Sequence, residues 1–403
     1  MDRKKLKVYT ASSVGIDYFL FLNKTIENGG YFTEPIFLIS ESNYRRLSKA
    51  SGFQKMWLRA QMYLFYPMLL IYKAIVCNQQ SVFVITSNTF YAPLLTQLIL
   101  RWRKIKVIHL LYDLFPDALE IAGVLRPNAL FSKSLGNLMR LSQRNCDATV
   151  YLGDYLRFHA ESRWGKTKIS QVIDISTDLT LYQEEFSLLK DDNKLILHYG
   201  GQFGHLHDAV SLIESIKYVC ESDISRFIEF NFYVSGAQTK LLENSLKGYP
   251  VKIISAVPSH LWRRDVKGFH IGLVSLSPGG ASVCLPSKTY SMMAAGLAIL
   301  TICPEWSDLA MLVNNSNAGW VINNSAYSEK SDLIEDNYLL KIQEKRNLDE
   351  IVKCFYNTLK DILSDKVSLR SKRKSSYHEM RNNYNIDSLS AKWKTLIEEV
   401  HEN

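Results

Sequence analysis

The chain has 403 residues, of which 47% are hydrophobic and 22% are charged. This composition indicates a folded globular protein with room for two domains, and it excludes general disorder. The six cysteines are scattered, without a CxxC pair or a Cys/His cluster at metal-ligand spacing, so we expect thiols in a reducing compartment and no bound metal. The net charge of +8 comes without a nucleic-acid-binding motif, which argues against a nucleic-acid partner. Basic residues open the chain with no apolar segment behind them, so we predict no signal peptide.

The first half of the chain alternates short apolar runs with helical patterns. We predict strands at 6–11, 35–40, 81–86, 106–111 and 148–152. Helices are predicted at 18–26, 53–78, 90–103, 130–145 and 153–164. This alternation is typical of a doubly wound parallel sheet covered by helices.

The predicted helix at 53–78 allows two interpretations. Its apolar part, 62–76, is too short to cross a bilayer, which takes about 20 residues, and Pro67 should kink it. It is either a packed helix of the domain or an interfacial contact with an anionic membrane surface. The membrane interpretation depends on the basic residues near its start, which are Arg45, Arg46, Lys49, Lys55 and Arg59. For the net charge of the chain, basic residues on solvated faces are the alternative to a membrane partner.

Polar residues follow two strands of this half, where parallel sheets bind ligands. Asp113 and Asp117 come directly after the strand at 106–111. Asp113 is a candidate for catalysis or for binding a sugar hydroxyl, and Asp117 either joins it or caps the helix after Pro116. Gly15 follows the first strand, where a residue without a side chain lets a ligand approach the backbone.

The apolar pattern lapses between 173 and 194, where we place the domain boundary. A second series then gives strands at 195–199, 229–234, 251–254, 271–276, 298–302 and 319–322. Its helices are predicted at 207–220, 238–246, 258–266, 287–295 and 305–313. Polar residues from 325 onward suggest a loop, and helices follow at 348–363, 366–381 and 387–401. We expect one domain over 1–176, completed by 386–403, and a second over 177–385.

Two loops of the second half are candidates for binding an anion. The first is Gly200-Gly201-Gln202-Phe203-Gly204, whose G-G-x-x-G spacing does not match the dinucleotide fingerprint. The second runs from Ser277 to Ser282 and precedes a helix that starts near Ser287 and Lys288. A helix N-terminus and a lysine together favour a phosphate-bearing ligand.

These residues resemble a known family. The GGQFG loop, the SLSPGG…LPSKTYSMMAAGLAIL segment and the HLLYDLFPDALEIAGVL segment are similar to GT-B glycosyltransferases of family 4. Within that family they resemble the branch that builds bacterial capsule, O-antigen and colanic-acid-type polysaccharides. The resemblance implies an α/β fold in which two Rossmann-like domains face a cleft, with helices at the C-terminus.

The resemblance also implies a function and a set of residues. The donor would be a UDP- or GDP-sugar and the acceptor a polyprenyl-diphosphate-linked glycan, with retention, no metal and no other cofactor. The protein would be cytoplasmic, or peripheral on the inner face of the plasma membrane. Catalytic residues would be Asp113 and Lys288. Donor-binding residues would be Gly200, Gly201, Gln202, Gly204, His207, Ser287, Lys288, Tyr290 and Ser291. Acceptor-side residues would be Gly15, Asp17, Tyr112 and Asp117.

The chain departs from the family pattern at several positions. Val283 and Ser291 stand where many members carry an acidic pair, and Tyr112 replaces a histidine. Gln202 and His207 lie near the positions of a common arginine and lysine, so Lys288 would be the main positive charge on the diphosphate. An inactive glycosyltransferase-like scaffold subunit is therefore an alternative. A sugar-nucleotide epimerase is a third reading, although the carboxylates that it would need are not evident.

Overall fold

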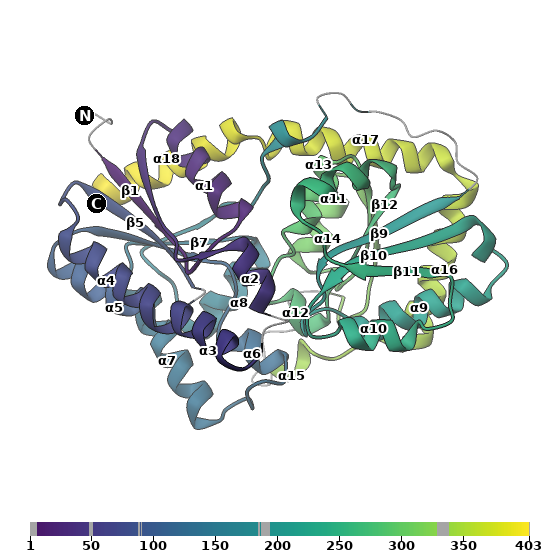
Figure 1. Cartoon of the computed structure of the whole chain (residues 1–403), viewed down its shortest axis with the longest axis horizontal. Helices are drawn as coiled ribbons and strands as arrows, with labels where there is room; N and C mark the ends of the chain where they lie inside the picture. The colour runs from purple at the N-terminus through teal and green to yellow at the C-terminus, as the bar shows by residue number, and fades with distance from the viewer. Residues whose placement is uncertain are drawn as a thin grey trace. The chain divides into compact units, whose positions relative to one another are not determined.

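The computed structural model describes residues 6–47, 51–87, 89, 91–183, 186, 194–328 and 338–402, except for the side chains of residues 45–47 and 340. The chain divides into two compact units (Figure 1). Unit 1 comprises Met1–Thr177 and Tyr384–Asn403, and unit 2 comprises Asp178–Asn383. Each unit is built around a six-stranded parallel sheet covered by helices, as the alternating pattern predicted.

The sheet of unit 1 has the strand order β3-β1-β5-β6-β7-β8. Its strands are β1 (Lys7–Ala11), β3 (Phe32–Ile36), β5 (Ser81–Thr86), β6 (Lys106–Leu111), β7 (Ala148–Tyr151) and β8 (Ile169–Val172). A separate two-stranded ladder joins β2 (Val14–Gly15) to β4 (Ile39–Ser40). Chain direction across the sheet reverses between β1 and β5, where Thr86 Oγ1 donates to the Ala11 carbonyl at 3.1 Å.

One strand prediction for unit 1 was wrong, and one strand was missed. The predicted strand at 35–40 divides into β3 and β4, and Pro35 belongs to β3, which is an edge strand and therefore tolerates a residue without an N–H group. The sequence also gave no signal for β8. All four of its residues are half-buried, so the alternation that marks most strands is missing there.

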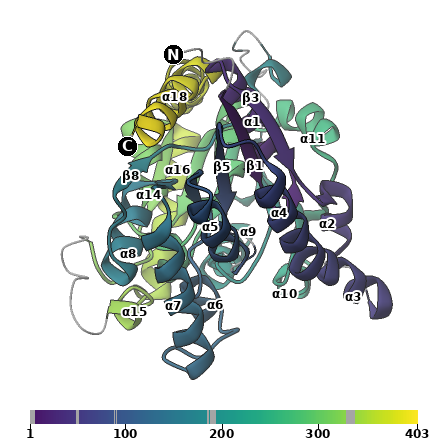
Figure 2. The ribbon, with the colours of Figure 1, turned by 90° about the vertical axis from the view of Figure 1, so that its left-hand side faces the viewer.

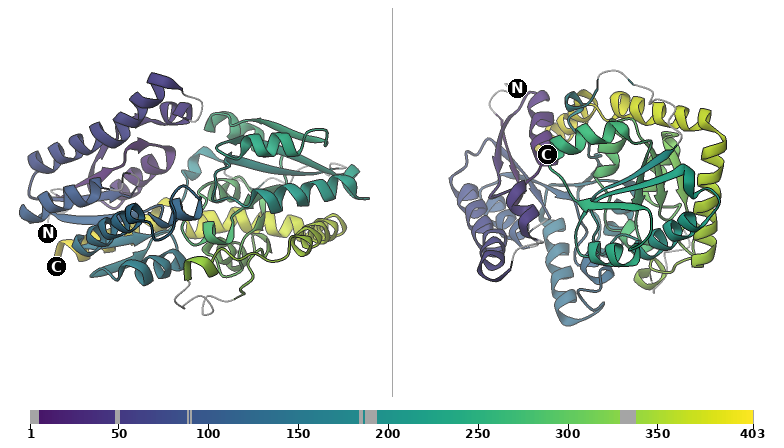
Figure 3. Two further views of the ribbon diagram at one scale, coloured as in Figure 1. Left: turned by 90° about the horizontal axis from the view of Figure 1, so that it is seen from below. Right: turned by 45° about the vertical axis from the view of Figure 1, so that its right-hand side comes forward.

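The helices of unit 1 include one long stretch that is interrupted near its middle. Its parts are α3 (Gly52–Ala60), a π-helical turn (Gln61–Phe65) and α4 (Tyr66–Val76). The interruption lies just before Pro67, whose missing N–H cannot bond to residue 63, so the single helix expected at 53–78 is replaced by three segments. Figure 3 (left) shows them in dark blue and purple as one nearly continuous rod. Among the described residues, no helix has the length and apolarity to span a bilayer.

The remaining helices of unit 1 pack on its sheet. They are α1 (Asp17–Asn28), α2 (Glu41–Leu47), α5 (Ala92–Trp102), α6 (Asp117–Ile121), α7 (Leu130–Asn145), α8 (Asp154–Trp164) and α18 (Ile386–Glu402). The C-terminal helix α18 lies against α1, where Asn28 Nδ2 donates to Asp387 Oδ1 at 2.9 Å. The last helix of the chain therefore completes the first unit.

The sheet of unit 2 has the strand order β11-β10-β9-β12-β13-β14. Its strands are β9 (Leu195–Gln202), β10 (Ile228–Ser235), β11 (Val251–Ser255), β12 (Ile271–Ser275), β13 (Ala298–Ile302) and β14 (Gly319–Ile322). This is the Rossmann order, in which the chain direction across the sheet reverses between the first and fourth strands. The reversal lies between β9 and β12, and we call it the switch point of unit 2.

Helices cover both faces of this sheet, with the C-terminal pair α16 and α17 in yellow-green (Figure 3, right). They are α9 (Ala209–Glu221), α10 (Thr239–Ser245), α11 (Ser259–Asp265), α12 (Pro278–Ala281), α13 (Lys288–Ala294), α14 (Asp308–Asn315), α15 (Tyr338–Lys341), α16 (Leu348–Ser364) and α17 (Lys366–Asn383). The segment 277–282, predicted as a loop, forms the short helix α12. Ser277 explains this difference, because its hydroxyl accepts from Gly280 N at 3.0 Å and caps the helix.

Candidate functional site

The two glycine loops of unit 2 contact each other at its switch point. Both the backbone N–H and the hydroxyl of Ser277 donate to the Leu206 carbonyl, at 2.9 and 3.1 Å. His207 Nδ1 lies 2.6 Å from the Ser275 carbonyl and therefore donates to it. The loop after β9 and the turn after β12 are thus bonded to each other at the carboxyl ends of neighbouring strands, where ligands of such sheets bind.

Glycines allow this close contact for different reasons. A Cβ on Gly280 would lie 2.2 Å from the Leu206 carbonyl oxygen, so any side chain there collides with backbone. Gly201 has a φ of +113°, and a Cβ there would meet Lys288 Cγ at 3.0 Å. Gly200 lies against the His198 ring, whereas a Cβ on Gly204 would meet nothing within 4 Å. Of the three glycines predicted to bind the donor, Gly204 is therefore the one with room for a side chain.

Lys288 is held beside the first loop by side chains that the sequence did not single out. Its stem lies against Gly201, and its ammonium lies 5.7 Å from the centre of the Trp262 ring. Trp262 Nε1 in turn donates to His198 Nε2 at 2.8 Å. Burial lowers the pKa of His198 to about 4, so the ring is neutral and its Nδ1–H donates to the Asn231 carbonyl at 3.1 Å. A chain of contacts from β10 through β9 and α11 therefore positions the lysine.

Helix α13 is shorter than the predicted 287–295, with only seven residues from Lys288 to Ala294. Ser287 precedes the helix and makes no side-chain cap. In a helix this short, the charge of Lys288 attracts an anion more strongly than the helix dipole does. Ser287 and Ser291 are half-buried and Gln202 is exposed, so all three have surface available to a ligand. Tyr290 is only 1% exposed and packs in the core, which corrects the expectation that it contacts the donor.

A buried network behind the loops fixes their position. Asp208 caps α9 and accepts from Lys345 Nζ at 2.8 Å and from Asn324 Nδ2 at 2.7 Å. Asn324 Nδ2 also donates to the Leu276 carbonyl at 2.8 Å, next to the turn after β12. Burial lowers the pKa of His207, so its Nε2 carries the lone pair in the neutral ring. Lys345 and Asn324 come from a stretch that the sequence marked only as polar, so no local signal could have found them.

Asp113 lies at the carboxyl end of β6 in unit 1. Its backbone carbonyl accepts from Ser87 Oγ at 3.0 Å, which ties the segment to the end of β5. Burial raises the pKa of Asp113 to about 6. Its charge also contributes to the raised pKa of Tyr44, after the larger effect of burial, so the two side chains are neighbours. Within the described part of the chain, no hydrogen-bond donor is bonded to the Asp113 carboxylate.

Asp117 differs from Asp113 although it follows only four residues later. Its side chain is fully buried, and its two oxygens meet Arg163 at 2.8 Å and His159 at 3.2 Å, both on α8. The carboxylate therefore joins α6 to α8 and has no surface to offer an acceptor. We assign Asp117 a structural role. It does not cap the helix as the sequence suggested, because Pro116 stands at the N-cap of α6 and the helix has no side-chain cap.

The other predicted acceptor-side residues lie near the switch point between β1 and β5. The half-buried Tyr112 ring lies 5.4 Å from Tyr18 and 6.0 Å from Phe19, measured between ring centres. Asp17 is exposed in the first turn of α1. A Cβ on Gly15 would meet Phe37 at 2.9 Å, so this glycine is required by packing. Aromatic rings and Asp113 thus lie at the carboxyl ends of the inner strands of this sheet.

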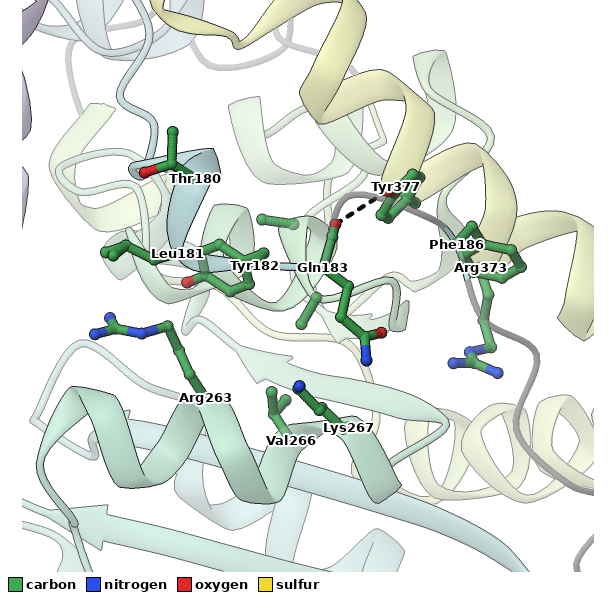
Figure 4. A pocket seen from close by; sticks show the side chains of 12 residues that line it. Thr180, Leu181, Tyr182, Gln183, Phe186, Arg263, Val266, Lys267, Arg373 and Tyr377 are labelled. Atoms are coloured by element: carbon green, nitrogen blue, oxygen red, sulfur yellow. Dashed lines mark hydrogen bonds between the residues drawn. The ribbon is translucent and has the colours of Figure 1, made fainter.

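A separate cavity of unit 2 contains none of the predicted site residues. It has a volume of about 190 Å³ and lies at the end of α13 opposite Lys288 (Figure 4). Arg263, Lys267 and Arg373 line it, and Tyr377 donates to the Gln183 carbonyl at 3.0 Å beside it. Among the described residues, no three His, Cys, Asp or Glu side chains cluster as metal ligands.

Comparisons with known proteins support the fold. No protein-family model matches the chain. WbjE of Pseudomonas aeruginosa, described as a probable glycosyltransferase, is 22% identical over 226 residues, which are 53% of this chain and 55% of WbjE. The chain thus matches about half the length of this curated relative.

Two solved structures match over nearly the whole chain. HepE of Anabaena, in complex with UDP and glucose, has a TM-score of 0.65 and 9% identity, and the match covers 98% of this chain and 100% of HepE. Sucrose-phosphate synthase of Thermosynechococcus elongatus has a TM-score of 0.64 and 11% identity, over 98% and 99% of the two chains. With its two Rossmann-like parallel sheets, the chain therefore has the GT-B fold.

The contact between the two loops predicts that a side chain is tolerated at one glycine and destabilises the protein at another. Gly280→Ala should reduce the free energy of unfolding by about 1–3 kcal/mol, because its methyl group collides with the Leu206 carbonyl. Gly204→Ala should change it by less than about 0.5 kcal/mol, since the space there is open. Urea denaturation of both variants measures the difference, and equal losses of stability would contradict the described packing.

The raised pKa of Asp113 predicts a pH-dependent effect on stability. The folded value of about 6 exceeds the unfolded value of about 3.9, so folding favours the protonated acid. That contribution is complete below the unfolded pKa and is lost as the pH rises through the folded one. Asp113→Asn cannot ionise at this position. The free energy of unfolding of the variant, relative to that of wild type, should therefore rise by about 1–3 kcal/mol when the pH is raised from about 4.5 to about 7.5.

Urea denaturation of wild type and variant at both pH values gives this difference. Asp361→Asn, at an exposed position on α16, is the matched control and should show no such gain. A difference between wild type and Asp113→Asn that stays the same at both pH values would show that the Asp113 carboxyl is not desolvated.

Proposed function

We propose that the chain is a glycosyltransferase that moves a sugar from a UDP- or GDP-sugar onto a growing bacterial surface polysaccharide. The observation that carries this proposal is the position of Lys288. Its stem lies on Gly201 and its ammonium beside Trp262, at the switch point where a Rossmann-type sheet binds its ligand. In this proposal unit 2 binds the donor and unit 1 binds the acceptor.

The role of Lys288 follows from the chemistry of the donor. The bond between the sugar C1 and the diphosphate oxygen breaks, and the nucleoside diphosphate leaves with the electron pair. The acceptor oxygen bonds to C1 and loses its proton. A lysine held beside the diphosphate stabilises the charge that develops as it leaves, and it supplies without a metal what a metal ion provides elsewhere. We therefore propose a metal-independent reaction and, from the family resemblance, one that retains the configuration at C1.

Asp113 suits the acceptor side of this reaction. With a pKa of about 6 it is mostly ionised at neutral pH, yet basic enough to accept the proton of a sugar hydroxyl. The paired rings of Tyr112 and Tyr18 lie near the same strand ends and offer an apolar surface against which a sugar ring can pack. We propose a polyprenyl-diphosphate-linked glycan as the acceptor, which would bring the enzyme to the cytoplasmic face of the membrane.

The comparisons add support of a general kind. HepE holds UDP and glucose, and WbjE is described as a probable glycosyltransferase. A nucleotide sugar is thus the donor class that agrees with both the fold and the position of Lys288.

One observation favours a second candidate, an inactive scaffold subunit. Val283 stands at one position of the family's acidic pair and is fully buried, so that position belongs to the core of this chain. Ser291 stands at the other and cannot replace a carboxylate in binding ribose. A scaffold of this kind would bind UDP or GDP weakly or not at all, and it would transfer no sugar from any donor.

Lys288→Ala tests the proposed function. Loss of a charged contact to the diphosphate costs about 1.5–3 kcal/mol, so kcat/KM for the preferred nucleotide sugar should fall by about 12- to 150-fold. Lys240→Ala, at an exposed position of α10, is the matched control and should change kcat/KM by less than about twofold.

The assay uses radiolabelled UDP- and GDP-sugars with membrane-extracted glycolipid acceptors. A Lys288→Ala enzyme that stays within threefold of wild type would contradict the diphosphate role of the lysine. Nucleotide binding by wild type without transfer from any donor would favour the scaffold.

A further inference from the structure

Unit 1 carries a layer of helices that contain no acidic side chain. The layer consists of α3, the following π-helical turn and α4 (52–76), α5 (92–102) and α7 (130–145), and we call it the carboxylate-free layer. The whole segment from Ser42 to Tyr112 lacks Asp and Glu but contains ten lysines and arginines. The ten positive charges of this segment exceed the net charge of the entire chain, which is +8.

Helix α4 has apolar residues on two opposite sides, and its one charged residue, Lys73, pairs with Glu34 at 2.6 Å. Tyr66, Leu70 and Ala74, spaced four residues apart, are fully buried against the sheet. Met68 and Tyr72 lie on the opposite side and are each 58% exposed. Helices that are apolar all round are normally buried all round. The outward side of α4 therefore has the composition of a covered surface, although no part of unit 1 among the described residues covers it.

The neighbouring helices repeat this pattern. On α5, Leu95, Leu98 and Trp102 point outward at helical spacing, and Trp102 is 86% exposed. On α7, Leu130 is 84% exposed. Helix α5 contacts α4 on one side and α7 on the other, so the outward faces adjoin, as Figure 2 shows. Sixteen of the 25 large hydrophobic side chains that are exposed in the described residues lie in this layer, which makes a patch and not scattered single residues.

Cationic side chains are interspersed with the apolar ones. Arg59 on α3, Arg101 and Lys104 at the end of α5, and Lys133 and Arg140 on α7 are all exposed. Lys49 was predicted to act in the same way but lies outside the described residues, as do the side chains of Arg45 and Arg46. Exposed tryptophan, tyrosine, leucine, lysine and arginine without carboxylates are the side chains that polypeptides place at a phospholipid surface.

We propose that the carboxylate-free layer binds the surface of an anionic phospholipid bilayer. The absence of carboxylates selects this partner over a protein, because a protein surface of mixed charge would find no acidic partner for its own basic groups. The apolar side chains of α3, α4 and α5 enter the headgroup region, and the basic ones contact lipid phosphates. This inference rests on the proposed function in one respect, that sugar transfer takes place at the membrane. The binding surface itself is inferred from its own residues.

Sedimentation of the full-length protein with vesicles tests the proposal. The protein should sediment with phosphatidylcholine vesicles that contain phosphatidylglycerol at low salt, and much less with pure phosphatidylcholine or at high salt. The Arg101→Glu/Lys104→Glu variant should lower the partition coefficient by about tenfold or more. The Met68→Ser/Tyr72→Ser variant should lower it by a similar factor, because it removes two side chains from the headgroup region.

Matched controls come from unit 2. Lys240→Glu/Lys247→Glu and Leu241→Ser/Val367→Ser change exposed residues of the same kinds outside the layer and should sediment as wild type does. Circular dichroism and thermal unfolding establish that each variant is folded. Equal loss in the layer variants and in the controls would overturn the proposal, as would failure of the wild type to sediment with anionic vesicles.

Two further outcomes separate this proposal from others. If the layer variants dissolve a dimer that ultracentrifugation detects in wild type, and vesicles are not bound, the layer is a subunit interface and the membrane proposal falls. If wild type binds vesicles but neither UDP nor GDP, the membrane proposal stands and the proposed function falls. If wild type binds UDP or GDP but not vesicles, the membrane proposal falls and the proposed function stands.

Discussion

The contact between the loop after β9 and the turn after β12 is the constraint on which the candidate donor site depends. Ser277 donates twice to the Leu206 carbonyl, and only a glycine at position 280 lets the two backbones come this close. The contact fixes where the chain enters α13 and so places Lys288 against Gly201. The Asp208 network and the His198–Trp262 pair support it from behind. A change in this contact would shift the start of α13 and with it Lys288.

The sequence predicted most strands and helices because the apolar runs are short, regular and separated by turn residues. It failed where tertiary context decides, as at the edge strand β3 and the evenly half-buried β8. Pro67 predicted an interruption of the helix at 53–78, but not that it would take the form of a π-helical turn. For the site, glycine loops and Lys288 could be found because their signals are local. His198, Trp262, Asn324 and Lys345 could not, since their partners lie 33 to 137 residues away along the chain. Asp113 and Asp117 looked alike in the sequence and differ only in what surrounds them.

Positively charged side chains link the two proposals. In unit 2, Lys288 lies beside an aromatic ring and glycine backbone. In unit 1, a whole layer of helices has exposed cations and no acid. Exposed charges at a surface contribute little to folding, so selection for stability does not explain the cations of this layer. We propose an anionic partner for both, a diphosphate for Lys288 and lipid phosphates for the layer.

Calorimetric titration of wild type and Lys288→Ala with UDP and with uridine, and likewise with GDP and guanosine, tests the central claim most directly. The account predicts that Lys288→Ala loses affinity for the nucleoside diphosphate by about tenfold or more and leaves affinity for the nucleoside unchanged. Unchanged binding of the diphosphate, or equal losses for diphosphate and nucleoside, would contradict it.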